Sequence, residues 1–194
     1  MIEIRLHGRA GQGMVTGAEL IAYAANLEGK YSQAFPFFGS EKRGPPVEAY
    51  CRIDDRPITI HEEIEAPDIV LVGDSSIMGN VDVCSGIKPN GIVIVNSPKS
   101  PKELGLNGKG LNVITVNATE VALKHFKKLI LNTVMLGAFC KVTGVVKIDS
   151  MKKAIQESLA GKLGKAVTEA NISAVQDVFD IVSGQKGVVK AVAK

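Results

Sequence analysis

Three runs of apolar, largely β-branched residues constrain the fold of this chain more than any other feature. They cover residues 69–73, 91–96 and 111–117. Runs that are apolar throughout, rather than alternating with polar residues, are typical of strands that are covered on both faces of a sheet. Helix-like segments alternate with strands along the chain. The sequence therefore predicts an α/β fold, a three-layer Rossmann-like domain with a mostly parallel sheet and right-handed crossovers.

The two ends of the chain extend this prediction. Residues 2–7 alternate apolar and polar side chains as a strand does, and residues 14–27 have helical periodicity. The C-terminal third predicts helices over 132–141, 150–159 and 165–181. Because 45% of the 194 residues are hydrophobic, the chain can bury one sizeable core. We therefore expect a single domain over 1–184 and a short tail over 185–194.

Residues 31–53 differ in character from the rest of the chain. Two extended stretches, 33–39 and 46–53, flank a polar segment that contains several turn-forming residues. The prolines at positions 36, 45 and 46 exclude a continuous helix here. The sequence therefore predicts an extended, hairpin-like insertion near residues 31–53.

Composition excludes several classes of function. The chain has 23 Lys and Arg against 20 Asp and Glu, a net charge of +3 that is too balanced to indicate nucleic-acid binding. Three cysteines, Cys51, Cys84 and Cys140, lie far apart in the sequence, and none belongs to a C-x-x-C pair. Neither an iron–sulfur cluster nor a zinc site can be assembled from such spacing. We therefore expect no metal bound by this chain alone.

The sequence also bears on where the protein is located. An odd number of cysteines argues against a disulfide framework, and the chain opens directly as a strand, without a signal peptide. The longest apolar stretch, 129–146, is interrupted by Asn132 and Lys141 and resembles a buried helix more than a membrane span. We expect a cytoplasmic protein that does not enter a membrane.

A glycine-rich loop between the first strand and the first helix is the first candidate site. The residues that carry it are Gly8, Arg9, Gly11, Gln12 and Gly13. Backbone N–H groups at a helix N-terminus form a natural anion site, and a guanidinium beside them can bind the same oxygens. The spacing G-x-x-G-x-G matches neither the dinucleotide fingerprint nor the P-loop. Two interpretations remain open, a phosphate or pyrophosphate site and a tight turn that lets strand and helix pack closely.

An aromatic segment is the second candidate. Phe35, Pro36, Phe37 and Phe38 are followed by a turn with Arg43, Gly44 and Pro45. In an extended segment three phenylalanines cannot all face one side, so some aromatic surface is left for a partner unless all three lie in the core. We predict a partner interface over this segment. Arg43 is a surface charge, an ion-pair partner or a reader of an acidic or phosphate group.

The histidines do not form a catalytic or metal-binding set. His7, His61 and His125 have no spacing typical of ligands, and structural or exposed roles are expected for each. Only His7, at the end of the first strand, lies near a candidate site. Neither a Ser/His/Asp set nor a pair of carboxylates can be identified, so we predict no catalytic residue in this chain.

At these same segments the sequence resembles the γ subunits of pyruvate and related 2-oxoacid:ferredoxin oxidoreductases, which correspond to the third domain of the single-chain enzymes. The resemblance is carried by residues 4–13, 29–47 and 132–138 and by Asn171 in a late helix. It spans nearly the whole chain, and the run from 33 to 47 is long enough to be specific. The sequence departs from the family at Ala10, where many relatives have glycine, and at Pro45, where glycine or alanine is more usual.

The resemblance implies a subunit of an oxidoreductase that decarboxylates a 2-oxoacid, releases an acyl-coenzyme A and reduces ferredoxin. Such a complex is expected to use thiamine diphosphate, Mg, 4Fe–4S clusters and coenzyme A, with thiamine and clusters held by the α, β and δ subunits. This chain would bind none of them alone and would be inactive in isolation. Its glycine loop, with Arg9 and Arg43, would suit the phosphates of coenzyme A. The aromatic segment favours pyruvate or a branched-chain substrate over 2-oxoglutarate.

Two other functions remain as alternatives. One is a stand-alone Rossmann-like module that binds a nucleotide or coenzyme A and regulates another protein. The other is an independent NAD dehydrogenase, which the glycine spacing disfavours. The sequence does not identify the particular oxoacid.

Overall fold

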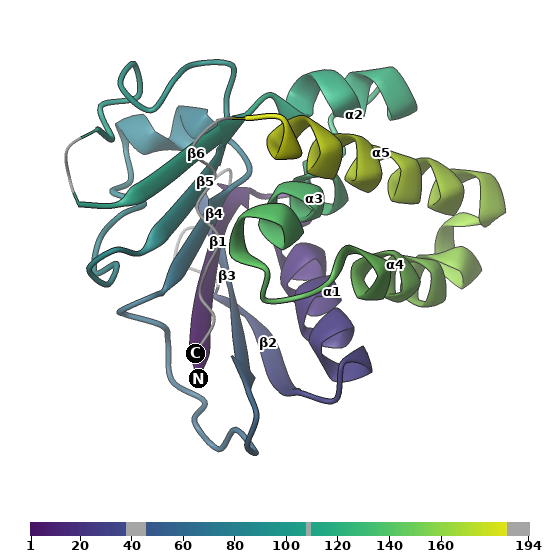
Figure 1. Ribbon diagram of the computed structural model, residues 1–194, viewed down its shortest axis with the longest axis horizontal. Coiled ribbons are helices and arrows are strands. Elements are labelled where there is room, and N and C mark those ends of the chain that lie inside the picture. The colour runs from purple at the N-terminus through teal and green to yellow at the C-terminus, as the bar shows by residue number, and fades with distance from the viewer. Residues whose placement is uncertain (38–45, 108–109, 186–194) are drawn as a thin grey trace.

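The chain folds around one mixed sheet. The computed structural model describes residues 1–37, 46–107 and 110–185 (Figure 1). Within them, six strands are ordered β2-β3-β1-β4-β5-β6 across the sheet. These strands are β1 (Ile2–Arg9), β2 (Tyr31–Phe37), β3 (Pro46–Asp54), β4 (Ile69–Val72), β5 (Ile92–Asn96) and β6 (Asn112–Val116).

Strand directions confirm the predicted mostly parallel sheet. β1, β4, β5 and β6 are mutually parallel, while β3 pairs antiparallel with both β1 and β2. The three apolar runs of the sequence are β4, β5 and β6, and every residue of β4 and β5 is buried. The expected insertion near 31–53 is the β2–β3 hairpin. Its connection, residues 38–45, lies outside the described residues, so Phe38, Arg43, Gly44 and Pro45 have no structural account.

Five helices cover one face of the sheet, as Figure 1 shows. They are α1 (Met14–Leu27), α2 (Ala118–Phe126), α3 (Leu131–Thr143), α4 (Ile148–Leu163) and α5 (Lys165–Ser183). Side chains that alternate along the strands, such as Ile4 and Leu6 of β1, pack against these helices in the larger core cluster. The helices expected in the C-terminal third are therefore present, each somewhat longer than its sequence pattern indicated.

The opposite face of the sheet is covered by loops and a short 3-10 helix. The 3-10 helix η1 (Ser75–Gly79) and the connecting loops form this layer, and Ile77 and Leu106 pack there against Val70 and Val93 of the sheet. The two crossovers from β4 to β6 thus lie on one face, while the longer α-helices lie on the other. Within the described ranges, no helix has the length and apolar character needed to span a bilayer.

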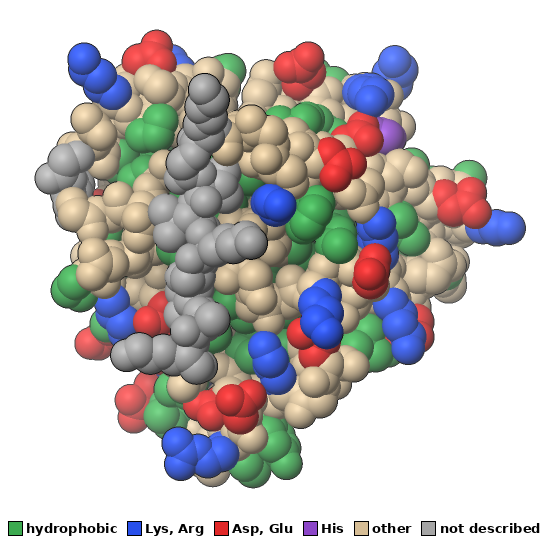
Figure 2. All heavy atoms as spheres, viewed as in Figure 1, with side chains coloured by type: hydrophobic (Ala, Val, Ile, Leu, Met, Phe, Trp, Pro, Cys, Tyr) green, Lys and Arg blue, Asp and Glu red, His purple; other side chains and the backbone are tan. Residues whose placement is uncertain are grey.

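Charged side chains are distributed evenly over the face in view. Figure 2 shows Lys and Arg interspersed with Asp and Glu over the helices and strands of this face. Such mixing is typical of a solvated surface, whereas a nucleic-acid interface gathers basic residues in a patch. This distribution agrees with the near balance of charge in the sequence.

Candidate functional site

The glycine loop joins β1 to α1 at the carboxyl end of the parallel strands, where α/β proteins commonly bind ligands. β1 extends two residues further than its sequence pattern indicated, because Gly8 and Arg9 pair with β3. Gly11 and Gly13 both have positive φ, +84° and +73°. Backbone of this kind favours glycine, since a Cβ would be strained there.

Gly13 is also held by close packing. It is the N-cap of α1, and a Cβ placed on it would lie 2.5 Å from Asn132 Nδ2, at the start of α3. Nothing lies within 4 Å of the corresponding position at Gly11. The two glycines therefore differ, because Gly13 is required by both backbone conformation and space, and Gly11 by backbone conformation alone.

The start of α1 has the properties of an anion site. Gly13 has no side chain to cap the helix, and the first turn contains no acidic residue. The first N–H groups of a helix have no intrahelical partner and carry the positive end of the helix dipole. The geometry of this loop is therefore compatible with both interpretations, a tight turn and an anion site.

Arg9 is held by a carboxylate that the sequence did not point to. Its Nε donates to Asp74 Oδ2 at 3.1 Å and its guanidinium also reaches Ser76 Oγ at 2.9 Å. Gln12 Nε2 donates to the same Asp74 oxygen at 3.0 Å and its own Oε1 accepts from the Arg9 N–H. The loop is thus tied to the segment that follows β4, and Arg9 is 44% exposed beside it.

Asp74 stays ionised in this arrangement. Partial burial raises the pKa of its carboxyl, but hydrogen bonds from Ser76 and Gln12 and the charge of Arg9 lower that pKa by more. Its position after a buried parallel strand adjacent to β1 is the signal that could have identified it, because the carboxyl ends of neighbouring parallel strands meet.

His7 lies on the face of β1 opposite the helices, inside a buried polar network. Arg5 Nε donates to His7 Nε2 at 3.0 Å, which assigns the imidazole proton to Nδ1. His7 Nδ1 lies 3.5 Å from Glu48 Oε1, and Tyr50 donates to the other Glu48 oxygen at 2.7 Å. Burial, with the charge of Arg5, lowers the pKa of His7 to about 4 against the opposing effect of Glu48. His7 is therefore neutral at pH 7, and its buried Nδ1 makes no hydrogen bond with any described residue.

The aromatic segment lines this same face of the sheet. Phe35 and Phe37 of β2 lie on either side of Tyr50, with ring centroids at 5.3 and 6.1 Å. The guanidinium of Arg52 lies over the Phe35 ring at 5.4 Å from its centroid. Both phenylalanines are partly buried, and Pro36 between them is exposed on the edge strand. A partly exposed aromatic surface, as expected from the sequence, is present in the described part of the hairpin.

The remaining candidate groups have local structural partners. His61 Nδ1 is hydrogen-bonded to Gln33 at 2.7 Å, and His125 Nε2 to Asp177 at 2.8 Å. All three cysteines are buried, one on β3, one in a loop on the opposite face and one in α3. Among the residues of 1–37, 46–107 and 110–185, no three His, Cys, Asp or Glu side chains are grouped to hold a metal ion.

Comparison with known proteins places this arrangement in a family. The family model described as pyruvate ferredoxin/flavodoxin oxidoreductase matches residues 3–181. The "Pyruvate/ketoisovalerate oxidoreductases common subunit gamma" of Thermococcus litoralis is 50% identical over 182 residues, which cover 93% of this chain and 96% of that protein. The "Pyruvate synthase subunit PorC" of Methanothermobacter thermautotrophicus is 49% identical over 178 residues, covering 92% and 96%.

Solved structures agree with these relatives. The crystal structure of pyruvate oxidoreductase subunit PORC from Thermotoga maritima has a TM-score of 0.79 and 35% sequence identity, and the match covers 92% of this chain and 95% of that chain. The same fold occurs within the 2-oxoglutarate:ferredoxin oxidoreductase of Magnetococcus marinus, with a TM-score of 0.78, 19% identity and coverage of 97% of this chain but 32% of that longer one. The chain therefore belongs to the pyruvate ferredoxin/flavodoxin oxidoreductase family and is a γ subunit of the PorC type.

Proposed function

We propose that this γ subunit is an accessory, coenzyme A-side component of a heteromeric complex that converts pyruvate or a branched-chain 2-oxoacid to an acyl-coenzyme A and reduces ferredoxin. The names of the relatives, which refer to pyruvate and ketoisovalerate, support this class of substrate. In such a complex, thiamine diphosphate with Mg supplies the decarboxylation chemistry, and iron–sulfur clusters carry the electrons. We further propose that the α, β and δ subunits hold these groups and that the complex is cytoplasmic.

The side chains of this subunit do not fit an iron–sulfur cluster. Cys51 and Cys140 are fully buried in the helical core, and burial raises the pKa of each thiol well above its usual range, which disfavours the thiolate that ligates iron. Cys84 lies on the other side of the sheet, against the loops. No electron-transfer step is therefore assigned to this chain, and its contribution is to bind and to position.

The glycine loop is the proposed site for the phosphates of coenzyme A. The observation that carries this assignment is the uncapped start of α1, where Gly13 supplies no side-chain acceptor and the first turn has no acid. The loop would hold the pyrophosphate through the backbone N–H groups of Gly11 and Gly13, since the Gln12 N–H already donates to the Arg9 carbonyl oxygen at 3.0 Å. Arg9 would add positive charge at the edge while Asp74 fixes its orientation. Gly8 allows close approach of Met14, since a Cβ there would lie 2.6 Å from Met14 Cγ.

Arg43 is proposed as the second charge on coenzyme A. It follows β2 and precedes β3, and β3 ends its pairing with β1 at Arg9 and Pro46. The start of β3, which follows Arg43 in the sequence, therefore lies next to the glycine loop. This register supports a joint role for the two segments in one anion site.

The aromatic segment is the proposed contact with the other subunits. Phe35, Pro36 and Phe37 present a partly exposed apolar surface on an edge strand, a combination that is often covered in an assembly. We also assign Phe38, Gly44 and Pro45 to this proposed contact, from their place in the sequence. Ferredoxin would be reached through the assembled complex rather than by this chain.

Purification of the native complex tests this function. A tag on this chain is expected to recover larger subunits together with iron and thiamine, and the Gly13→Ala complex is expected to have a raised KM for coenzyme A with an unchanged KM for the oxoacid. Recovery of the tagged chain alone from cells that express the whole complex would instead favour a stand-alone binding module. An unchanged KM for coenzyme A would contradict the assignment of the glycine loop.

A further inference from the structure

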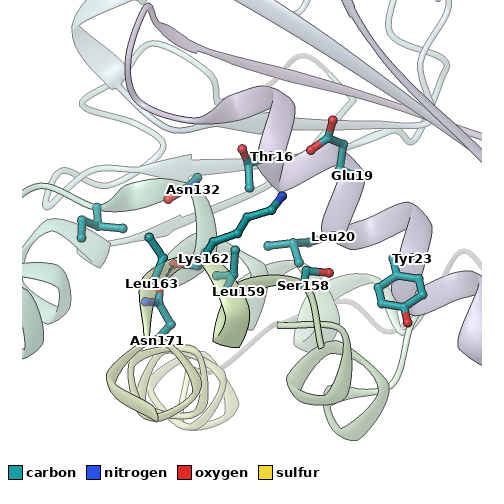
Figure 3. Close-up of a pocket in the computed structure, with 12 residues that line it drawn as sticks. Thr16, Glu19, Leu20, Tyr23, Asn132, Ser158, Leu159, Lys162, Leu163 and Asn171 are labelled. Atoms are coloured by element: carbon teal, nitrogen blue, oxygen red, sulfur yellow. Dashed lines mark hydrogen bonds between the residues drawn. The ribbon is translucent and has the colours of Figure 1, made fainter. Parts of the chain in front are cut away.

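The helical face contains a pocket that the proposed coenzyme A site does not use. It has a volume of about 420 Å³ and lies between the first turns of α1 and α3, the end of α4 and the start of α5 (Figure 3). Binding sites for small molecules commonly have volumes in this range and combine an apolar lining with a few polar groups. Arg9 and Asp74, which contact each other in the glycine loop at the carboxyl end of β4, are not among the residues that line this pocket.

The floor and rim of the pocket are apolar. Leu20 of α1 and Leu159 of α4 are buried at 2% and 7% exposure and form the floor. Leu163, the last residue of α4, also lines the pocket and is 49% exposed. An aliphatic ligand that covered Leu163 would bury its apolar surface, and this burial would contribute favourable hydrophobic free energy to binding.

Several polar side chains around this floor have no partner in the part of the chain that the structure describes. Five lining side chains make no hydrogen bond or ion pair with any described residue: Thr16, Glu19, Asn132, Ser158 and Lys162. Two other polar lining residues, Thr133 and Asn171, are by contrast hydrogen-bonded to each other. The unpartnered groups come from three different helices and meet at one cavity, which is typical of a binding site rather than of a solvated surface.

Lys162 and Glu19 are the two charged side chains of the lining, and they point in different directions. Figure 3 shows the Lys162 side chain extended across the pocket toward α1, while the Glu19 carboxylate points away from the apolar floor. The first turn of α3, where Asn132 lies, has neither a side-chain cap nor an acidic residue to neutralise its N–H groups. A carboxylate near the Lys162 amine would also be within the field of that helix N-terminus.

We propose that this pocket binds a small carboxylate with an aliphatic body. Lys162 would bind the carboxylate, with Asn132 and Thr16 as hydrogen-bond donors. The aliphatic part would lie on Leu159 and Leu163. The site does not depend on the proposed coenzyme A site, although Asn132 also packs against Gly13 and so contacts both.

Titration of the isotope-labelled full chain at pH 7 tests the ligand class. The probes are 3-methylbutanoate, 3-methylbutan-1-ol and 3-methylbutan-1-amine, which share an aliphatic body and differ in charge. We expect saturable shifts of the amide signals of Thr16, Asn132 and Ser158 with the carboxylate. The affinities for the alcohol and the amine, taken from the same titrations, should be at least about tenfold weaker. Equal responses to all three probes, or none to the carboxylate up to about 10 mM, would refute the proposal.

Variants at exposed positions identify the residue that binds the carboxylate of the ligand. Lys162→Met is expected to weaken 3-methylbutanoate binding about tenfold, because a charge-assisted hydrogen bond is lost. Lys162→Arg should retain most of the affinity. Lys102→Met, an exposed lysine in the loop between β5 and β6, serves as the control and should have no effect. Unchanged binding by Lys162→Met, or equal losses in Lys162→Met and Lys102→Met, would exclude the proposed role.

Discussion

Individual residues in this protein act mainly by fixing the relative positions of neighbouring strands and loops. Asp74 holds Arg9 and Gln12 at the end of β4, and Glu48 of β3 lies 3.5 Å from the buried His7 of β1. Neither pairing could be read from the sequence, because Arg9 and Asp74 are 65 positions apart and only the order of strands in the sheet brings them together. The glycine loop itself was recognisable, because two positive-φ glycines before a helix leave a local signature.

His7 gives the fold a dependence on pH. Its pKa is about 4 in the folded chain and 6.5 in the unfolded chain, so below pH 6.5 the unfolded state binds a proton that the folded state does not. Acidification from pH 6.5 to about 4 should therefore cost on the order of 3 kcal/mol of unfolding free energy. Urea unfolding across this pH range measures it. His7→Gln can still accept a hydrogen bond from Arg5, but its unfolding free energy should lose the part of the pH dependence that comes from His7. An unchanged dependence of the unfolding free energy on pH would contradict the role of His7.

The two positive-φ glycines of the loop provide a matched pair of variants. Gly11→Ala should destabilise by about 1–2 kcal/mol, because only the backbone conformation is strained. Gly13→Ala should lose at least about 1 kcal/mol more, since Asn132 must move as well. Urea unfolding of both variants tests this order. Equal losses would show that Asn132 does not restrict the loop.

Among the elements, the pairing of α3 with α5 includes two specific close contacts. Thr133 of α3 donates to Asn171 of α5, and a Cβ on Gly137 would lie only 2.1 Å from the carbonyl oxygen of Val175. The helical periodicity of both segments was readable from the sequence. Their close approach was not, because it depends on which faces meet. The same holds for the placement of all five helices on one face, since a run that is apolar throughout does not specify what covers each side.

Replacement of Gly137 tests this close approach. Gly137→Ala should destabilise the chain by roughly 3 kcal/mol, because backbone atoms of α5 would have to shift. Gly161→Ala is the control, since Gly161 lies within α4 with nothing within 4 Å, and should stabilise by up to about 1 kcal/mol. Thermal unfolding distinguishes the two. A neutral Gly137→Ala would indicate that α3 and α5 are further apart than described.

At the scale of the whole molecule, the proposed functions fall on three parts of the structure. The glycine loop lies at the carboxyl end of the parallel strands, the aromatic hairpin forms one edge of the sheet, and the carboxylate pocket lies on the helical face. We propose that residues 1–184 act as one unit carrying all three. The membership of the oxidoreductase family was recognisable from sequence because its motifs coincide with the glycine loop, the hairpin and the start of α3.

The hairpin edge should govern assembly. Pro36 is exposed on β2, so Pro36→Asp is expected to leave the melting temperature of the isolated chain within about 2 °C while lowering its recovery in the complex. Ile181→Asp, on the exposed side of α5, is the control for a new acidic residue and should assemble normally. Size-exclusion chromatography of the co-expressed subunits provides the measurement. Normal assembly of Pro36→Asp would place the interface elsewhere.

The most direct test of the account is an assay of viologen reduction with pyruvate and coenzyme A, using the purified chain alone and then the reconstituted complex. We expect no reduction by the chain alone and coenzyme A-dependent reduction once the other subunits are added. Reduction of viologen by the isolated chain would contradict this expectation, because the chain would then contain the redox chemistry that we assign to its partners.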